Sequence, residues 1–402
     1  MTPITSNTRR LFTPTEGMAI VLFLIFILKF ISQFTFDWPH VDDFNMIDWY
    51  RRYFVTKEWS LLEIAKVQNG PHWQGGQALL SVLLFKIFGV GFSYFVYINI
   101  AVIVSSATLF FLVIGREFEL EKARLFALIF IFFIFFSPVQ ADHILWPYEL
   151  GWFLVNLSLI ANITLIERLK TGALIYVVII SAFSFTMSAQ GAFLWLAAAL
   201  QFSLLPITNR RKFLTTAINA LGFVICYATL RYGSEEGRLP TFGQLPEFAV
   251  YLLQLLGSGF GIRNTAVCFV LGLVIFSSTI VVLALSYRRH RDEGTFRASS
   301  ALIFASAGFI AAFGVARFNL GAPWAMHTFH AAPLVVIWYL GLGISTLKLV
   351  ATRREKGELI VKFVLAAIVL ILLVSTVSSA KYGLERANET YRRHIKIGRA
   401  HV

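Results

Sequence analysis

The sequence predicts an all-α integral membrane protein, and two observations carry this prediction. The chain of 402 residues is 57% hydrophobic and only 14% charged, which is more apolar sequence than a soluble domain of this size can bury. The apolar residues also fall into runs of about 17–25, the length that an α-helix needs to cross a bilayer. The first run, 17–36, is too long for a signal peptide and has no small-residue cleavage site, so we interpret it as a retained helix.

Eleven apolar runs are expected to span the membrane. Their ranges are 17–36, 92–115, 125–144, 150–167, 172–187, 190–207, 213–230, 265–287, 298–316, 331–348 and 360–379. Because this number is odd, the two ends of the chain are expected on opposite sides. Residues 1–396 then form a single polytopic domain. We interpret residues 397–402 as a translated sequencing adapter, with an ordinary basic tail as the alternative.

The distribution of charge predicts the orientation. Lysine and arginine gather in every second loop, for example around Arg116, Arg168 and Arg289, and the intervening loops hold most of the acids. Short loops rich in basic residues stay on the cytoplasmic side. We therefore expect a cytoplasmic N-terminus in the cytoplasmic (inner) membrane, with the acidic loops on the outer face. This pattern accounts for the net charge of +13, and no basic, aromatic-rich soluble module predicts a nucleic-acid partner.

Three outer segments are longer than a connection requires: 37–91, 231–264 and a tail from 380 to 396. Polar residues that spanning does not need tend to carry function in a membrane protein, so the site is expected outside the membrane. Cys226 and Cys268 lie in apolar runs and lack the spacing of metal ligands. We expect buried free thiols, with a disulfide as the alternative.

The first outer loop holds an acidic pair, Asp42-Asp43, directly before aromatic residues that recur at helical spacing from Phe44 to Phe54. This pattern predicts a helix in the membrane interface, with Arg51-Arg52 facing lipid phosphates. One aspartate can simply cap that helix. Alternatively, a carboxylate just above the bilayer can accept a proton from a hydroxyl of a substrate. It can also hold Mg²⁺ or Mn²⁺ against a lipid-borne phosphate, with Asp43 as the metal ligand.

A second polar cluster, residues 69–76, closes this loop and opens a second juxtamembrane helix at His72. In order, the chain shows the acidic pair, the amphipathic stretch, Asn69-Gly70-Pro71-His72, an apolar run ending in Phe88-Gly89, a long helix, and Arg116 in a basic turn. This order resembles the first third of the GT-C glycosyltransferases, in particular their protein O-mannosyltransferase and aminoarabinose-transferase branch. In this chain Pro71-His72-Trp73 replaces the His-Pro-Pro triplet of that branch.

The resemblance implies a GT-C-like fold and a sugar donor linked to polyprenyl phosphate. It also implies that Asp42 and Asp43 are catalytic residues, that His72 binds substrate and that the reaction occurs on the outer face.

Further polar residues are expected at the outer ends of later helices. Asp142, His143 and Glu149 would cluster between the third and fourth spans, where they can bind sugar hydroxyls or a metal. The alternative is an ordinary solvent-exposed turn. The remaining substrate-binding candidates are Arg263, Arg317 and His330. A guanidinium binds phosphate through two hydrogen bonds, which favours Arg317 as the partner of a lipid phosphate. Snorkelling to the interface is the alternative.

Two classes of function follow from these residues. The leading expectation is a glycosyltransferase that moves a sugar from a polyprenyl-phosphate donor to a hydroxyl of a glycan, lipid or protein acceptor. The alternative is a polytopic transporter or flippase, or a polymerase of lipid-linked glycans. A transporter predicts charges near the middle of the membrane and an internal repeat, and neither is clear in the sequence. The sequence also contains no phosphate-binding loop and no nucleophile elbow.

Overall fold

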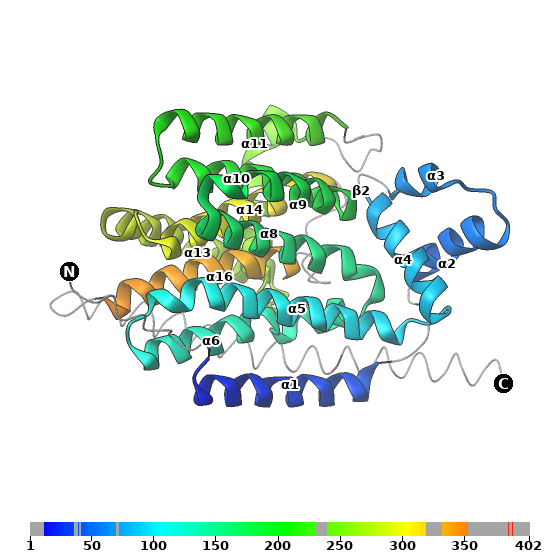
Figure 1. Cartoon of the computed structure of the whole chain (residues 1–402), viewed down its shortest axis with the longest axis horizontal. Helices are drawn as coiled ribbons and strands as arrows, with labels where there is room; N and C mark the ends of the chain where they lie inside the picture. The colour runs from blue at the N-terminus through cyan, green and yellow to red at the C-terminus, as the bar shows by residue number, and fades with distance from the viewer. Residues whose placement is uncertain are drawn as a thin grey trace, which may run out of the picture.

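The computed structural model describes residues 12–35, 39, 42–69, 72–229, 239–318, 332–352, 385 and 388. Long helices lie side by side in a bundle, and short helices gather at one end of it (Figure 1). The helices α2 (Asp43–Tyr50), α3 (Leu61–Ala65) and α4 (Gly75–Phe88) mark this end, which we call the site end. The opposite end of the bundle is called the far end.

The long elements follow one another along the chain with short connections. They are α1 (Pro14–Phe34), α5 (Ser93–Ile114), α6 (Glu121–Phe135), α8 (Leu150–Leu169), α9 (Leu174–Met187), α10 (Phe193–Leu204), α11 (Asn209–Thr229), α12 (Leu245–Ser258), α13 (Thr265–His290), α14 (Gly294–Arg317) and α16 (Ala332–Ala351). The short elements between them are η1 (Arg51–Val55), η2 (Gly115–Glu117), η3 (Pro138–Gln140), α7 (Ala141–Ile144), η4 (Pro147–Glu149), η5 (Lys170–Ala173), η6 (Ala189–Ala192) and η8 (Phe242–Gln244).

The apolar helices indicate a multi-pass membrane protein. Within the described ranges, six segments are long and apolar enough to cross a membrane. They are Ser93–Glu117, Pro147–Met187, Asn209–Thr229, Thr265–His290, Gly294–Arg317 and Ala332–Ala351, and Gly75–Phe88 and Ala189–Leu204 are shorter apolar helices. The all-α class is thereby confirmed, whereas the expected number of eleven spans is not.

The first ten expected spans each coincide with a helix, and one of them differs in extent. The span expected over 125–144 ends as a helix at Phe135, and the chain then turns through η3, α7 and η4. Pro138 explains this end, because proline donates no backbone hydrogen bond and disfavours the helical conformation of the preceding Ser137. The span expected over 360–379 and the tail 380–396 lie outside the described residues, apart from Glu385 and Asn388.

Helices α14 and α16 lie at the centre of the bundle, and α16 is buried along nearly its whole length. Both are apolar on all sides, and such a helix is stable only where other helices or lipid cover it. Ser306 of α14 donates a hydrogen bond to the Leu334 carbonyl of α16, and the Tyr339 hydroxyl of α16 donates to the Leu256 carbonyl of α12. These contacts fix the relative positions of α12, α14 and α16.

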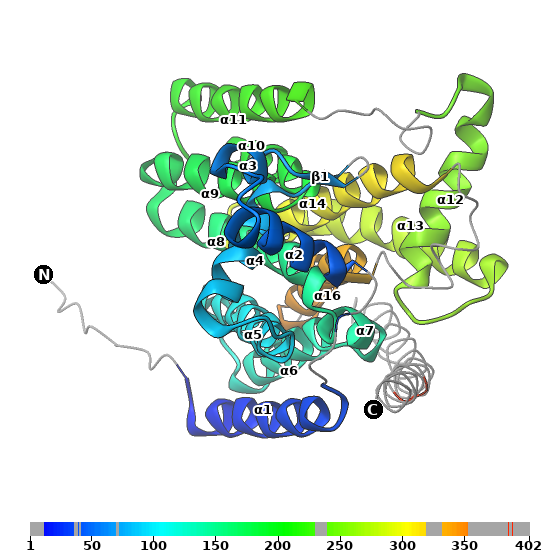
Figure 2. The same cartoon turned by 90° about the vertical axis from the view of Figure 1, so that its right-hand side faces the viewer.

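Helices α12 and α13 pack unusually closely on one side of the bundle (Figure 2). A side-chain carbon at Gly257 would lie 1.9 Å from the Cys268 carbonyl oxygen, and one at Gly272 would lie 1.8 Å from the Leu253 carbonyl oxygen. Only glycine permits this approach of the two backbones. The predicted state of the cysteines is confirmed, because Cys268 on α13 and Cys226 on α11 are both free and buried.

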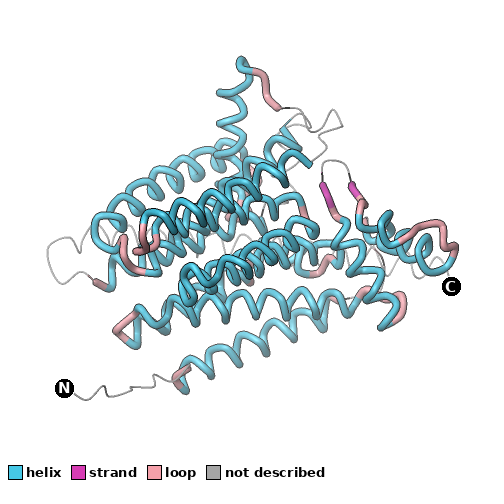
Figure 3. Tube along the Cα trace, turned by 45° about the horizontal axis from the view of Figure 1, so that its top comes forward, coloured by secondary structure: helices cyan, strands magenta, loops and turns pink. Residues whose placement is uncertain are grey.

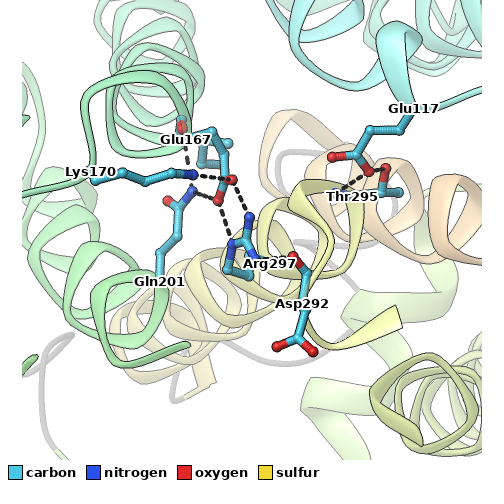
Figure 4. Close-up of polar contacts among 8 residues, drawn as sticks. Glu117, Glu167, Lys170, Gln201, Asp292, Thr295 and Arg297 are labelled. Atoms are coloured by element: carbon cyan, nitrogen blue, oxygen red, sulfur yellow. Dashed lines mark hydrogen bonds and ion pairs between the residues drawn. The ribbon is translucent and has the colours of Figure 1, made fainter. Parts of the chain in front are cut away.

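A buried charged network joins the helices at the far end (Figure 4). Arg297 on α14 binds Glu167 on α8 through two hydrogen bonds, from Nε to Oε1 at 2.9 Å and from a terminal nitrogen to Oε2 at 2.6 Å. Gln201 on α10 donates to the same carboxylate at 2.9 Å. The Arg297 and Glu167 side chains are only 4% and 8% exposed. The network therefore ties α8, α10 and α14 together at the end remote from α2–α4.

A short antiparallel pairing returns the first loop to the bundle before α4 begins. Strands β1 (Gln68–Asn69) and β2 (His72–Trp73) pair with Asn69 opposite His72 (Figure 3). Gln74 follows β2 and precedes α4, whose first residues Gly76 and Gln77 pack on the end of α9 and the start of α8. A helix is present where the second helix of the first loop was expected, although it begins at Gly75 and not at His72.

Candidate functional site

The two aspartates of the first loop have different surroundings. Asp42 occupies the N-cap position of α2, but its side chain makes no capping hydrogen bond. Asp43 lies in the first turn of α2 and is fully buried, and its Oδ1 accepts a hydrogen bond of 3.1 Å from the Tyr148 backbone N–H. The half-buried Asp42 carboxylate is therefore not used as a helix cap, and the Asp43 carboxylate is directed at the start of η4 and α8.

The break after Pro138 places a second set of polar side chains beside the first loop. His143 on α7 and Glu149 at the end of η4 are both buried, with His143 Nδ1 and Glu149 Oε1 3.5 Å apart. The His143 ring stacks on Trp152, with 6.3 Å between ring centroids. Oε2 of Glu149 is buried and accepts no hydrogen bond from the described residues. This carboxylate can therefore receive a hydrogen bond from a ligand hydroxyl.

Asp42, Glu149 and Arg317 interact electrostatically at the site end. Burial raises the pKa of the Asp42 carboxyl group, the negative charge of Glu149 raises this pKa further, and the positive charge of Arg317 lowers it. These residues come from three separate parts of the chain: the start of α2, the turn before α8 and the end of α14. Carboxyl groups whose pKa is shifted by burial and by neighbouring charges occur often at functional sites and also in structural ion-pair networks.

Tyr251 on α12 is a site residue that the sequence did not reveal. Its side chain is 1% exposed, and its hydroxyl has no hydrogen-bond partner in the part of the chain that is described. Burial raises the pKa of this hydroxyl, and the charge of Arg317 acts in the opposite direction. Arg317 therefore influences both Asp42 and Tyr251. The apolar spacing of Phe248, Tyr251 and Leu255 on a helix is the signal that could have located this tyrosine within 231–264.

The other candidate residues are not all brought to this site. Arg263 is exposed in the loop between α12 and α13, and Asp142 is partly buried on α7 beside His143. The backbone of His72 lies in β2, but its side chain is not among the atoms that the structure describes. His330 lies outside the described residues.

The two arginines that were expected to face lipid phosphates begin η1 and pair with an aspartate of the preceding α2. Arg51 and Arg52 bind the Asp48 carboxylate at 2.9 Å and 2.6 Å.

The residues present do not make an evident metal centre. Among the residues described, no group of three or more His, Cys, Asp or Glu side chains is arranged to hold a metal ion. Asp42 and Glu149 contribute two carboxylates, with the guanidinium of Arg317 nearby, and Asp43 is engaged by the Tyr148 N–H. The arrangement thus offers a carboxylate for proton transfer, a second carboxylate for hydroxyl binding, and a cation for an anionic group.

Comparison of the chain with protein-family models, curated proteins and solved structures found no match.

Proposed function

We propose that this chain is a membrane glycosyltransferase that moves a sugar from a polyprenyl-phosphate donor to a hydroxyl of a glycan, lipid or protein acceptor. The observation that carries the proposal is the grouping of Asp42, Glu149 and Arg317 at one end of an apolar helix bundle. A transferase of this kind needs a base for the acceptor and a cation for the phosphate, at the depth where a lipid presents its headgroup. The order of elements in the first loop, which resembles that of GT-C enzymes, supports the same function.

In the proposed reaction Asp42 acts as the general base. The acceptor oxygen attacks the anomeric carbon of the sugar while its proton passes to the Asp42 carboxylate. The bond between the anomeric carbon and the phosphate oxygen breaks, and its electron pair leaves with the polyprenyl phosphate. Arg317 neutralises the charge on that phosphate, and the buried Tyr251 hydroxyl donates a hydrogen bond to it. Glu149 orients the sugar or acceptor by accepting a hydroxyl hydrogen bond.

We propose that the site faces the outer side of the cytoplasmic membrane. The turns that we place on the inner side carry Arg116, Arg168 and Arg210. The start of α2 and the end of η4, which belong to the site, carry Asp42, Asp43 and Glu149. Short loops rich in arginine favour the cytoplasmic side. A donor in the outer leaflet would then reach the site from the bilayer.

The function is tested with purified protein in liposomes that contain radiolabelled polyprenyl-phosphate mannose, glucose or aminoarabinose. A membrane extract supplies acceptors. One donor is expected to yield labelled product together with free polyprenyl phosphate, and nucleotide sugars are expected to yield none. Transfer from a nucleotide sugar would overturn the proposal. Movement of the intact lipid-linked sugar across the bilayer, without cleavage by the protein, would assign the chain to the flippases.

The pH dependence of transfer should report the surroundings of Asp42. A general base must be deprotonated, so activity rises as the pH increases through the Asp42 pKa, which lies above its ordinary value. Glu149→Gln removes a negative charge, lowers this pKa, and is expected to move the acid limb of kcat/KM to lower pH. Arg317→Gln removes a positive charge and is expected to move the limb to higher pH. Initial rates between about pH 4 and pH 9 measure both shifts, and an unmoved limb in both variants would exclude Asp42 as the base.

A further inference from the structure

Three side chains of the first outer loop converge on one residue of the turn before α8. Asp43 Oδ1 accepts the Tyr148 backbone N–H, the Gln77 side-chain amide donates to the Tyr148 backbone carbonyl, and the Tyr148 hydroxyl donates to Gln74 Oε1. Tyr148 is 7% exposed, and all three partners are buried. Both backbone polar groups of Tyr148 and its hydroxyl are thus held by side chains more than 70 residues away in sequence.

The ring of Tyr148 is held as well. It contacts two tryptophans, with centroid distances of 6.0 Å to Trp49 of α2 and 6.1 Å to Trp146. Aromatic pairs at such distances contribute beyond the area they bury. The first loop therefore contacts Tyr148 through α2 and through the start of α4, which are separate helices.

Tyr148 lies at the start of a helix, where the backbone N–H groups need hydrogen-bond acceptors from outside that helix. The η4 turn is only three residues long, and the first N–H groups of the helix that it opens have no partner within that helix. Side chains from elsewhere must bind these groups if they are buried. Asp43 does so for Tyr148, and its negative charge is favourable at a helix N-terminus.

We propose that Asp43, Gln74 and Gln77 are positioning residues that hold Tyr148, and through it keep Glu149 facing Asp42. The inference rests on the proposed function for its catalytic consequence. The two residues joined by the hydrogen bond between Asp43 and Tyr148 each adjoin a residue of the proposed reaction. Asp43 follows Asp42, and Tyr148 precedes Glu149. The hydrogen bond between Asp43 and Tyr148 therefore joins the two segments that carry the Asp42 and Glu149 carboxylates. The Asp43 carboxylate is a hydrogen-bond acceptor here and takes no proton from substrate.

Amide hydrogen exchange tests this geometry without any substrate. Asp43→Asn keeps the Oδ1 acceptor, whereas Asp43→Ala removes it. We expect faster exchange of a peptide covering Tyr148 and Glu149 in Asp43→Ala, and exchange close to that of the wild type in Asp43→Asn. Unchanged exchange in Asp43→Ala would overturn the assignment of Asp43 as the partner that holds this turn. Because no sugar donor is involved, this result stands whether or not the chain is a transferase.

Transfer assays then test the consequence for catalysis. Asp43→Asn is expected to retain most of the wild-type rate. Asp43→Ala and Gln77→Leu are expected to lower kcat by roughly 100-fold, because a displacement of about 1 Å in a reacting group costs that much. KM should change little, since the phosphate-binding Arg317 lies on another helix. A loss in Asp43→Asn as large as that in Asp42→Asn would show that the Asp43 charge is itself needed and would overturn the proposal.

Two further variants separate positioning from folding. Tyr148→Phe removes only the hydroxyl that donates a hydrogen bond to Gln74, and it keeps the ring contacts with Trp49 and Trp146. It should stay folded, with a smaller fall in kcat than Asp43→Ala. A wild-type protein that transfers no sugar would refute the proposed function, whereas a fully active Asp43→Ala protein would refute the positioning role.

Discussion

Asp42→Asn is expected to lower kcat for sugar transfer by about 10²–10⁴-fold, the contribution that a positioned general base makes. Asparagine has nearly the same size as aspartate but cannot accept the proton of the acceptor hydroxyl. Asp42 makes no capping hydrogen bond to α2, so its replacement should leave that helix in place. Initial rates at saturating donor, together with the melting temperature, measure the two effects separately.

Asp48→Asn is the matched control on the same helix. Asp48 is a partly exposed aspartate that pairs with Arg51 and Arg52, with a side chain 39% exposed. Exposed ion pairs contribute little to stability, and Asp48 has no part in the proposed site. We expect a transfer rate like that of the wild type. A normal rate in Asp42→Asn would contradict the assignment of the base, and an equal loss in both variants would indicate a general effect of charge.

Arg297→Met is expected to lower the free energy of unfolding by about 3–5 kcal/mol, because it leaves the Glu167 carboxylate buried without its charged partner. The ion pair is almost fully shielded from solvent, and Arg297 also donates to the Asp292 carbonyl at 2.7 Å. Thermal or denaturant unfolding in detergent measures the loss. Transfer at temperatures well below the melting point should be retained, since this network lies at the far end of the bundle.

Arg291→Met is the control for Arg297→Met. Arg291 pairs with Asp292 at 3.7 Å, but these side chains are 63% and 78% exposed. Its loss should change the melting temperature little. The double variant Arg297→Met/Glu167→Met should recover part of the stability, because an apolar pair leaves no buried charge behind. A double variant that is less stable than both single variants would contradict this explanation.

The positions of the helices followed from the sequence because the signal for them is local. An apolar run long enough to cross a bilayer must form a helix, since lipid offers no other partner for its backbone polar groups. Helical spacing of the aromatic residues predicted the helix that forms α2, and a shorter apolar run predicted α4. The signal from apolar runs failed at Phe135, where the apolar run continues but Pro138 ends the helix, and it found no helix in the segment that forms α12.

The site was predictable in part. Asp42, Glu149 and Arg317 stood out as polar residues beside apolar helices, and in the structure the charges of Glu149 and Arg317 act on the Asp42 carboxyl group. Sequence distance carries no information on which side chains meet, so Arg263 was an equal candidate although it lies exposed in another loop. Tyr251 was missed because an aromatic residue on an amphipathic helix is usually part of the core.

The sequence by itself determined an apolar, all-α chain with clusters of basic residues in alternate turns, because both features depend only on the kind and order of residues. Tertiary structure decided the different surroundings of Asp42 and Asp43. They are identical in type and adjacent in sequence, and they differ because α2 directs one carboxylate at the Tyr148 N–H and leaves the other beside Glu149 and Arg317. That difference depends on contacts across more than 100 residues, which no local pattern can encode.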